Sequence, residues 1–257
     1  DFTMSPEKLK AAITNKTKAV IPVDIAGWPC DYDVIDDILN SEEVKNLFQS
    51  NNTNQRKLGM PLLLADAAHA VGAFYKNKPV GTVADVTIFS LHSVKNITTG
   101  EGGAICLNLP QPFNHEEEYK FLKALSINGQ TKSAFEKNQV GGWRYDIIAQ
   151  GMKVNMPDIC ASVGLAQIRK YKSVLLPERK KIFAYYSEAF KKYDWAILPA
   201  WENQEKISSF HLFMLRIKNI TEEQRDMMIH YISHQGIGVN VHYIPMPMLT
   251  LFKNLGY

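Results

Sequence analysis

An aspartate and a lysine stand at the ends of two apolar runs, where each could take part in chemistry. Asp66 closes the run 61–65, and Lys95 lies just past the run 83–91. The glycine-rich stretch 100–103 follows and lets backbone approach closely. Alone, the aspartate could be a helix cap or a turn residue, and the lysine a solvated surface charge. As a pair they place a carboxylate and an amine at strand ends, where open α/β sheets bind ligands.

Pyridoxal phosphate chemistry asks for such parts. An amine must form an imine with the cofactor and later move a proton. A buried carboxylate must keep the pyridine nitrogen protonated, so that the ring can take up electrons. A hydroxyl and backbone N–H groups must hold the phosphate. The residues around Asp66 and Lys95 therefore predict a pyridoxal phosphate site.

The elements that must position this pair read as a helix-flanked sheet. Ser5 followed by Pro6 is a helix start. Helical spacing of apolar residues runs from Tyr32 to Phe48, and the polar stretch 49–57 reads as a surface loop. Four compact apolar runs have strand length: 18–23, 61–65, 83–91 and 103–107. Runs that are apolar on both faces indicate a mostly parallel sheet, although the link between the second and third is too short for a helix.

The remainder predicts a smaller α+β domain. Residues 157–192 form a long helical stretch interrupted near Pro177. The stretches 208–217 and 239–244 read as strands around a helix that opens with the capping box at 221–224. We expect a large domain over 1–176 and a small domain over 177–257.

Composition excludes several classes. Hydrophobic residues make up 46% of the 257, charged residues 21%, and the formal net charge is +3, too weak a bias to indicate nucleic-acid binding. The three cysteines form no metal-ligand or disulfide pattern. No apolar run approaches the roughly 18 residues needed to span a bilayer. We expect a cytoplasmic protein that binds neither membrane nor nucleic acid.

Four segments, 66–81, 89–103, 155–167 and 242–245, resemble motifs of one family in order and spacing over nearly the whole chain. The sequence is similar to the DegT/DnrJ/EryC1/StrS sugar aminotransferases. The resemblance implies a pyridoxal phosphate fold of type I, like that of aspartate aminotransferase: an α/β large domain with a mostly parallel mixed sheet flanked by helices, and a smaller α+β C-terminal domain.

The resemblance also implies a role for each of five residues. Lys95 would form the Schiff base and act as the base in the proton shift. Asp66 would pair with the ring nitrogen, and His69 would lie near the cofactor's ring or its 3-hydroxyl. Ser90 would bind the phosphate. Lys153 would reach the phosphate across the interface of a homodimer with a shared active site. For His211 and His242 a structural role and a substrate contact both stay open.

The reaction implied is transfer of an amino group, with glutamate as donor, to C4 of a nucleotide-linked keto-deoxy sugar for lipopolysaccharide, capsule or flagellar glycans. Family members carry a segment before the position of Asp1 that completes the cofactor site, so we expect the large domain to be incomplete at its N-terminus and both ends to be cut. The rival interpretation is a non-catalytic truncated remnant of this fold that serves only as a binding or structural module. Lys95 argues against the related dehydratases, which carry histidine there. The stretch 100–103 lacks the Gly-x-Gly-x-x-Gly spacing of a nicotinamide enzyme.

Overall fold

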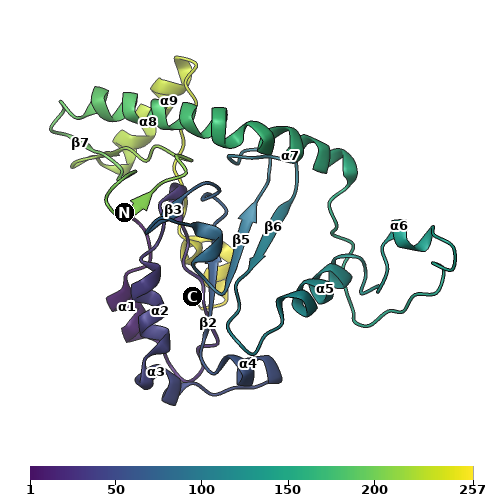
Figure 1. The fold of residues 1–257 in the computed structure, drawn as a ribbon. Coiled ribbons are helices and arrows are strands. Elements are labelled where there is room, and N and C mark those ends of the chain that lie inside the picture. Colours follow the sequence, from purple (N-terminus) through teal and green to yellow (C-terminus); the bar gives the residue numbers. More distant parts are fainter. Residues whose placement is uncertain (257) are drawn as a thin grey trace. The chain divides into compact units, whose positions relative to one another are not determined.

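The computed structural model describes residues 1–256 (Figure 1). They form two compact units, each described here by itself: one contains residues 1–192 and 198–214, and the other contains 193–197 and the residues from 215 onward. The expected domain boundary after residue 176 stays a prediction. Among the described residues, no helix is long and apolar enough to cross a membrane.

A four-stranded sheet lies at the centre of the first unit. Its strands, in spatial order, are β1 (Ala19–Val20), β2 (Leu62–Asp66), β5 (Val86–Ser90) and β6 (Gly103–Leu107). The first three are parallel, and β6 runs antiparallel to β5. The expected mostly parallel mixed sheet flanked by helices is therefore confirmed. Because β2 and β5 are parallel neighbours, their carboxyl ends lie at the same edge.

Helices on one side of this sheet bury its core. Helix α1 (Pro6–Ala12) begins as expected, since the Ser5 side chain accepts from the backbone N–H of Lys8. Helix α2 (Tyr32–Asn40) packs Ile35 and Leu39 against Leu63 of β2, and all three are at most 1% exposed. Burying each such side chain contributes about 1.5–3 kcal/mol. This packing makes β2 a rigid support for whatever follows its last residue.

Two predictions about the first helices were wrong. The expected helix 32–48 is two helices, because Ser41 leaves helical geometry and caps α3 (Glu42–Leu47). The expected loop 49–57 contains α4 (Thr53–Leu58), which is capped by Asn52 and ended by Gly59 in the left-handed conformation. No residue of α4 is buried, so it has no apolar face for a periodicity to reveal.

The second half of the first unit is mainly helical. Helix α7 (Asp158–Lys170) passes through a π-helical turn, Tyr171–Leu175, into α8 (Leu176–Phe190). This turn is the interruption expected near Pro177. The sequence did not indicate α5 (His115–Ser126) or α6 (Ala134–Lys137). We call residues 127–155 the arm; it is closed at its base by the bridge between Ile127 and Lys153, and Figure 1 shows α6 within it.

Three short strands form a small antiparallel sheet in the first unit: β3 (Phe74–Tyr75), β4 (Lys78–Pro79) and β8 (Lys206–Ile207), in the order β4-β3-β8. The expected strand 208–217 is wrong over 208–214. There the backbone of Ser208 donates to the carbonyl of Trp201, and that of Ser209 to the carbonyl of Gly27, instead of to a strand ladder. This segment therefore belongs to the packing around the central sheet.

The second unit is small. It pairs β7 (Ala196–Ile197) with β9 (Arg216–Ile217), followed by α9 (Glu222–His234) and α10 (Thr250–Asn254). Helix α9 opens with the predicted capping box of Thr221 and Gln224. The expected strand 239–244 is irregular backbone. Its alternating side chains are all exposed, so alternation there reports no buried face.

Candidate active site at the ends of β2 and β5

Asp66 is the last residue of β2, and its backbone is held from both sides. Its N–H donates to the carbonyl of Pro22 at 2.9 Å, and its own carbonyl accepts from Asp24 at 3.0 Å. The carboxylate Oδ1 accepts from the backbone of Ala68 at 3.1 Å. The Asp66 carboxylate therefore stabilises a turn, which is the structural role that the sequence also allowed. This is the carboxylate's one hydrogen bond among the described residues, so it retains acceptor capacity for a ligand.

Lys95 lies in the loop after β5, half-buried, with its N–H donating to the carbonyl of His92 at 2.9 Å. Burial lowers the pKa of its ammonium group, and the Asp66 carboxylate acts in the opposite direction. The two side chains therefore lie close enough to interact electrostatically. Within the described part of the chain they are not joined by an ion pair, so neither neutralises the other.

The loop that carries Lys95 is closed on itself. Leu91 donates to the carbonyl of Gly102 at 2.8 Å, and Thr99 donates to the carbonyl of Leu91 at 2.9 Å. Helix α7 reaches this loop, because the Gln167 Oε1 accepts from the backbone of Thr98 at 2.9 Å. Hydrogen bonds join the two ends of the loop and attach the loop to α7, so the backbone that carries Lys95 is held in place.

Ser90 is the last residue of β5, opposite Gly103 of β6. Its Oγ accepts from the backbone of His92 at 3.3 Å. Among the described hydrogen bonds none uses the proton of this hydroxyl, which suits donation to an anion. The side chain of His92 lies 3.6 Å from Glu101, so both belong to the rim of the same loop.

His69 is buried three residues beyond Asp66, in the turn after β2. Its Nδ1 accepts from the backbone of Ala26 at 3.1 Å. Its ring centroid lies 4.3 Å from that of His211, and the planes are inclined by 35°. The structure thus places His211 against His69, a contact that the sequence did not reveal, because 142 positions, 211 minus 69, separate the two residues.

Lys153 lies on the arm, exposed to solvent, with its Nζ donating to Asn155 Oδ1 at 2.6 Å. Among the described residues, no hydrogen bond or ion pair joins it to the other four predicted site residues. The structure therefore brings Asp66, His69, Ser90 and Lys95 to the ends of β2 and β5, and it leaves Lys153 outside this group.

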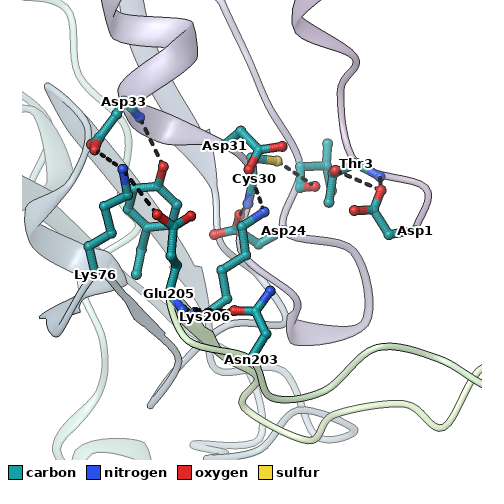
Figure 2. A network of polar contacts seen from close by, with 12 residues as sticks. Asp1, Thr3, Asp24, Cys30, Asp31, Asp33, Lys76, Asn203, Glu205 and Lys206 are labelled. Carbon is teal, nitrogen blue, oxygen red and sulfur yellow. Dashed lines mark hydrogen bonds and ion pairs between the residues drawn. The ribbon is translucent and has the colours of Figure 1, made fainter.

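A second lysine–carboxylate cluster in the same unit is fully bonded (Figure 2). Lys206 of β8 has a side chain only 6% exposed, and its Nζ lies 2.8 Å from Asp31. The aromatic rings of Trp28 and Tyr75 lie 5.5 and 5.9 Å from the same nitrogen, a distance that favours a cation. Charge, rings and burial all satisfy Lys206 internally, which indicates a structural lysine.

Asp24, next to this cluster, is completely buried. Its two oxygens accept from the backbone of Cys30 and from the hydroxyl of Tyr32, each at 2.8 Å. Burial raises the pKa of this carboxyl to about 6, although both hydrogen bonds and Lys206 act to lower it. With its acceptors occupied, Asp24 holds together the loop that also carries Ala26.

The first unit is thus built on an α/β sheet that carries a carboxylate at the end of β2 and an amine in the loop after its parallel neighbour β5. Residues 1–257 match the profile of the DegT/DnrJ/EryC1/StrS aminotransferase family, and the chain belongs to this family. Two curated relatives align with the whole chain. They are the uncharacterized protein MJ1066 of Methanocaldococcus jannaschii, 34% identical, and the spore coat polysaccharide biosynthesis protein SpsC of Bacillus subtilis, 31% identical. The chain covers 61% and 60% of their lengths.

Solved structures agree. Spr1654 of Streptococcus pneumoniae, assigned as a sugar aminotransferase, superposes in its PMP form with a TM-score of 0.92 at 40% identity, over 100% of this chain and 63% of that one. Helicobacter pylori PseC, an aminotransferase of pseudoaminic acid biosynthesis, superposes with a TM-score of 0.78 at 24% identity, over 98% of this chain and 60% of PseC. The second likeness supports the fold alone. The expected family and fold class are confirmed, and the chain spans about three fifths of these relatives.

Proposed function

We propose that the full-length protein is a pyridoxal phosphate-dependent aminotransferase that transfers an amino group from an amino acid to a sugar. The observation that carries this proposal is the position of Asp66 and Lys95 at one edge of the sheet, where the parallel neighbours β2 and β5 end. Membership of the family supports it, as does the likeness to Spr1654, whose structures include PLP and PMP forms.

The donor set fits the cofactor. Lys95 offers an amine, Asp66 a carboxylate, and Ser90 a hydroxyl whose proton is available for the phosphate. Gly100 has open space around its Cα and a positive φ of 81°, so backbone is accessible beside the lysine loop. When bound, pyridoxal phosphate supplies an electron sink for the carbon that exchanges its proton.

Each residue's own task follows from its surroundings. Burial lowers the pKa of the Lys95 amine, the direction that favours its action as a proton acceptor. Asp66, at the rigid end of β2, would hold a proton on the ring nitrogen. His69 would contact the ring or the 3-hydroxyl, and Ser90 would orient the phosphate. Proton transfer would thus be confined to the Lys95 amine.

We also propose the substrates. The acceptor would be a nucleotide-linked keto-deoxy sugar aminated at C4, the donor would be glutamate, and the product would enter lipopolysaccharide or another surface polysaccharide. The similarity to SpsC, a protein of spore coat polysaccharide biosynthesis, supports a polysaccharide pathway. The three cysteines are free thiols, which is consistent with the reducing cytoplasm as the place of action.

The proposed enzyme is a homodimer in which Lys153 serves the partner's site. Its support is the exposed position of Lys153 on the arm, away from the other site residues of its own chain. Lys95→Ala and Lys153→Ala subunits should each be impaired. After subunit exchange the mixture should regain about a quarter of wild-type activity, because half of the dimers then contain one intact site. No recovery, with heterodimers demonstrated, would contradict a shared site.

A direct assay tests the proposed reaction. The full-length protein is incubated with pyridoxal phosphate, glutamate and a nucleotide-linked 4-keto-6-deoxy sugar, and mass spectrometry follows both products. We expect the keto oxygen to be replaced by an amino group and 2-oxoglutarate to appear in equal amount. A panel of other donors and sugars tests the finer assignment. A protein that binds no cofactor and aminates no sugar would favour the non-catalytic remnant.

A further inference from the structure

A buried asparagine directly follows the candidate Schiff-base lysine. Asn96 is 6% exposed, and every polar atom of its side chain is engaged. Its Nδ2 donates to the carbonyl of Ser209 at 2.7 Å and to the hydroxyl of Tyr171 at 3.2 Å. Its Oδ1 lies 2.7 Å from Nδ1 of His211. A buried polar network that is fully satisfied is rigid, so Asn96 ties the lysine loop to two distant segments, the one with Tyr171 and the one with Ser209 and His211.

The direction of each bond in this network can be assigned. A backbone carbonyl can only accept, so the amide nitrogen of Asn96 must face Ser209. Tyr171 donates its own proton to the carbonyl of Val71 and therefore accepts from Asn96. The oxygen of Asn96 must then face His211. Since that oxygen cannot donate, Nδ1 of His211 carries the proton.

His69 is held in the opposite way. The backbone N–H of Ala26 donates to its Nδ1, so that nitrogen has no proton and the neutral ring carries its proton on Nε2. Ser209 connects the two histidines, because its hydroxyl donates to the carbonyl of His69 and its carbonyl accepts from Asn96. The two neighbouring rings are thus fixed from two directions.

Backbone strain accompanies both restraints. Ala26, the donor to His69, has a φ of 56°, and Phe210, between Ser209 and His211, has a φ of 55°. Left-handed backbone is uncommon for residues other than glycine and rarer still for a bulky one. Such strain persists where the surroundings enforce it, and it gathers at functional sites. Ala26 and Phe210 lie on the two segments that orient the histidine pair, so their strain indicates that the position of this pair matters for function.

We propose that Asn96 is a positioning residue that fixes the proton of His211 on Nδ1 and so holds the His211 ring against His69, whose own tautomer is set by Ala26. His69 is then a fixed N–H donor at Nε2, and His211 keeps its proton on Nδ1. Only the use of this pair toward the cofactor rests on the proposed function. There, the His69 ring held by this network would orient the cofactor.

The tautomers can be read directly. Full-length protein labelled with ¹⁵N in its histidines is recorded by two-bond ¹H–¹⁵N correlation, with and without pyridoxal phosphate. His69→Gln and His211→Phe variants assign the signals. We expect the proton on Nε2 of His69 and on Nδ1 of His211 in both states. A proton on Nε2 of neutral His211, or on Nδ1 of neutral His69, overturns the proposal.

Variants test the part played by Asn96. Asn96→Leu should release His211 into a mixture of tautomers and weaken pyridoxal phosphate binding at least about tenfold, the effect of one hydrogen bond. Asn108→Leu is the matched exposed control and should change neither quantity. His211→Asn places an amide nitrogen at the position of Nδ1, so its affinity for pyridoxal phosphate should stay within about threefold of wild type. The affinity of His211→Gln should fall further.

The outcomes separate the two proposals. An unchanged His211 tautomer in Asn96→Leu overturns the positioning role. If that variant does not fold, the contrast between His211→Asn and His211→Gln decides, and equal affinities of these two variants overturn the positioning role. If the expected tautomers occur in a protein that does not bind pyridoxal phosphate, the network stands and the proposed function fails.

Discussion

The first unit contains two lysine–carboxylate clusters that differ in every property relevant to reactivity. Lys206 is buried against two aromatic rings and bonded to Asp31 at 2.8 Å. Lys95 is half-buried on a loop, without an ion pair among the described residues, while Asp66 lies within electrostatic reach. The Lys206 ammonium group is therefore bound by an ion pair and two aromatic rings. The Lys95 amine makes no hydrogen bond or ion pair among the described residues, and only its backbone is held in place.

The two clusters show that the same residue types can serve structure in one place and chemistry in another. A buried ion pair that already satisfies its hydrogen bonds resists change, because removing one partner leaves the other charge uncompensated. A lysine whose pKa is lowered by burial, beside a carboxylate that keeps acceptor capacity, can change its protonation state during a reaction. The comparison makes opposite predictions for substitutions in the two clusters.

The largest expected effect belongs to Lys95→Ala. Turnover should fall at least about a thousandfold, because the amine that binds the cofactor and moves the proton is lost. Thermal unfolding should change little, since no described hydrogen bond or ion pair uses the Lys95 side chain. Turnover within tenfold of wild type would show that another residue does this work.

The second effect is a pH dependence of stability from Asp24. Burial raises the pKa of its carboxyl from 3.8 to about 6, so between these values the folded protein keeps a proton that the unfolded chain has released. The stabilisation is therefore present below about pH 4 and lost as the pH rises through 6. Relative to Asp24→Asn, the free energy of unfolding should fall by about 2.4 kcal/mol between pH 4 and 7. Denaturant titrations of both proteins at several pH values measure this difference, and parallel curves would refute it.

Asp66→Asn should lower turnover by on the order of a hundredfold, the effect of removing one electrostatic contact to the reacting system. The amide oxygen can still accept from Ala68, so the turn and the fold should persist. Stopped-flow measurement of the half-reaction with the amino donor would isolate this step. An unchanged rate would remove Asp66 from the site.

Lys206→Met should have the smallest effect, and on the opposite property. The free energy of unfolding should fall by about 2 kcal/mol, less than for a fully buried pair because the Asp31 side chain is 39% exposed. Turnover per folded molecule should stay within about twofold of wild type, since Lys206 touches none of the predicted site residues. A large loss of turnover with intact stability would collapse the contrast between the two lysines.

The sequence predicted much of the central architecture. Strands β2, β5 and β6 appear where apolar runs of strand length occur, although only β2 alternates with fully buried side chains, and the residues of β6 are exposed or half-buried. The positions of Asp66 and Lys95 at strand ends followed from the same runs. Periodicity could not show α4, which buries nothing, or the irregular path of 208–214, whose partners are Gly27 and Trp201.

The network around Asn96 lay beyond sequence reasoning for a physical reason. Its contacts to Ser209 and His211 join residues 113 and 115 positions apart, and no local spacing encodes such a meeting. The predicted role of Lys153 remains a prediction, because it concerns a second subunit. Candidate site residues could be proposed where they follow a single strand. Contacts between distant segments could not be predicted.

The central claim is that Lys95, and not the saturated Lys206, carries the cofactor. The full-length protein is incubated with pyridoxal phosphate, reduced with borohydride, digested and mapped by mass spectrometry. The account predicts one added pyridoxyl group, on the peptide containing Lys95, and none in the Lys95→Ala variant. A protein that gains no such mass, or carries it on Lys206 or any other lysine, would contradict the account.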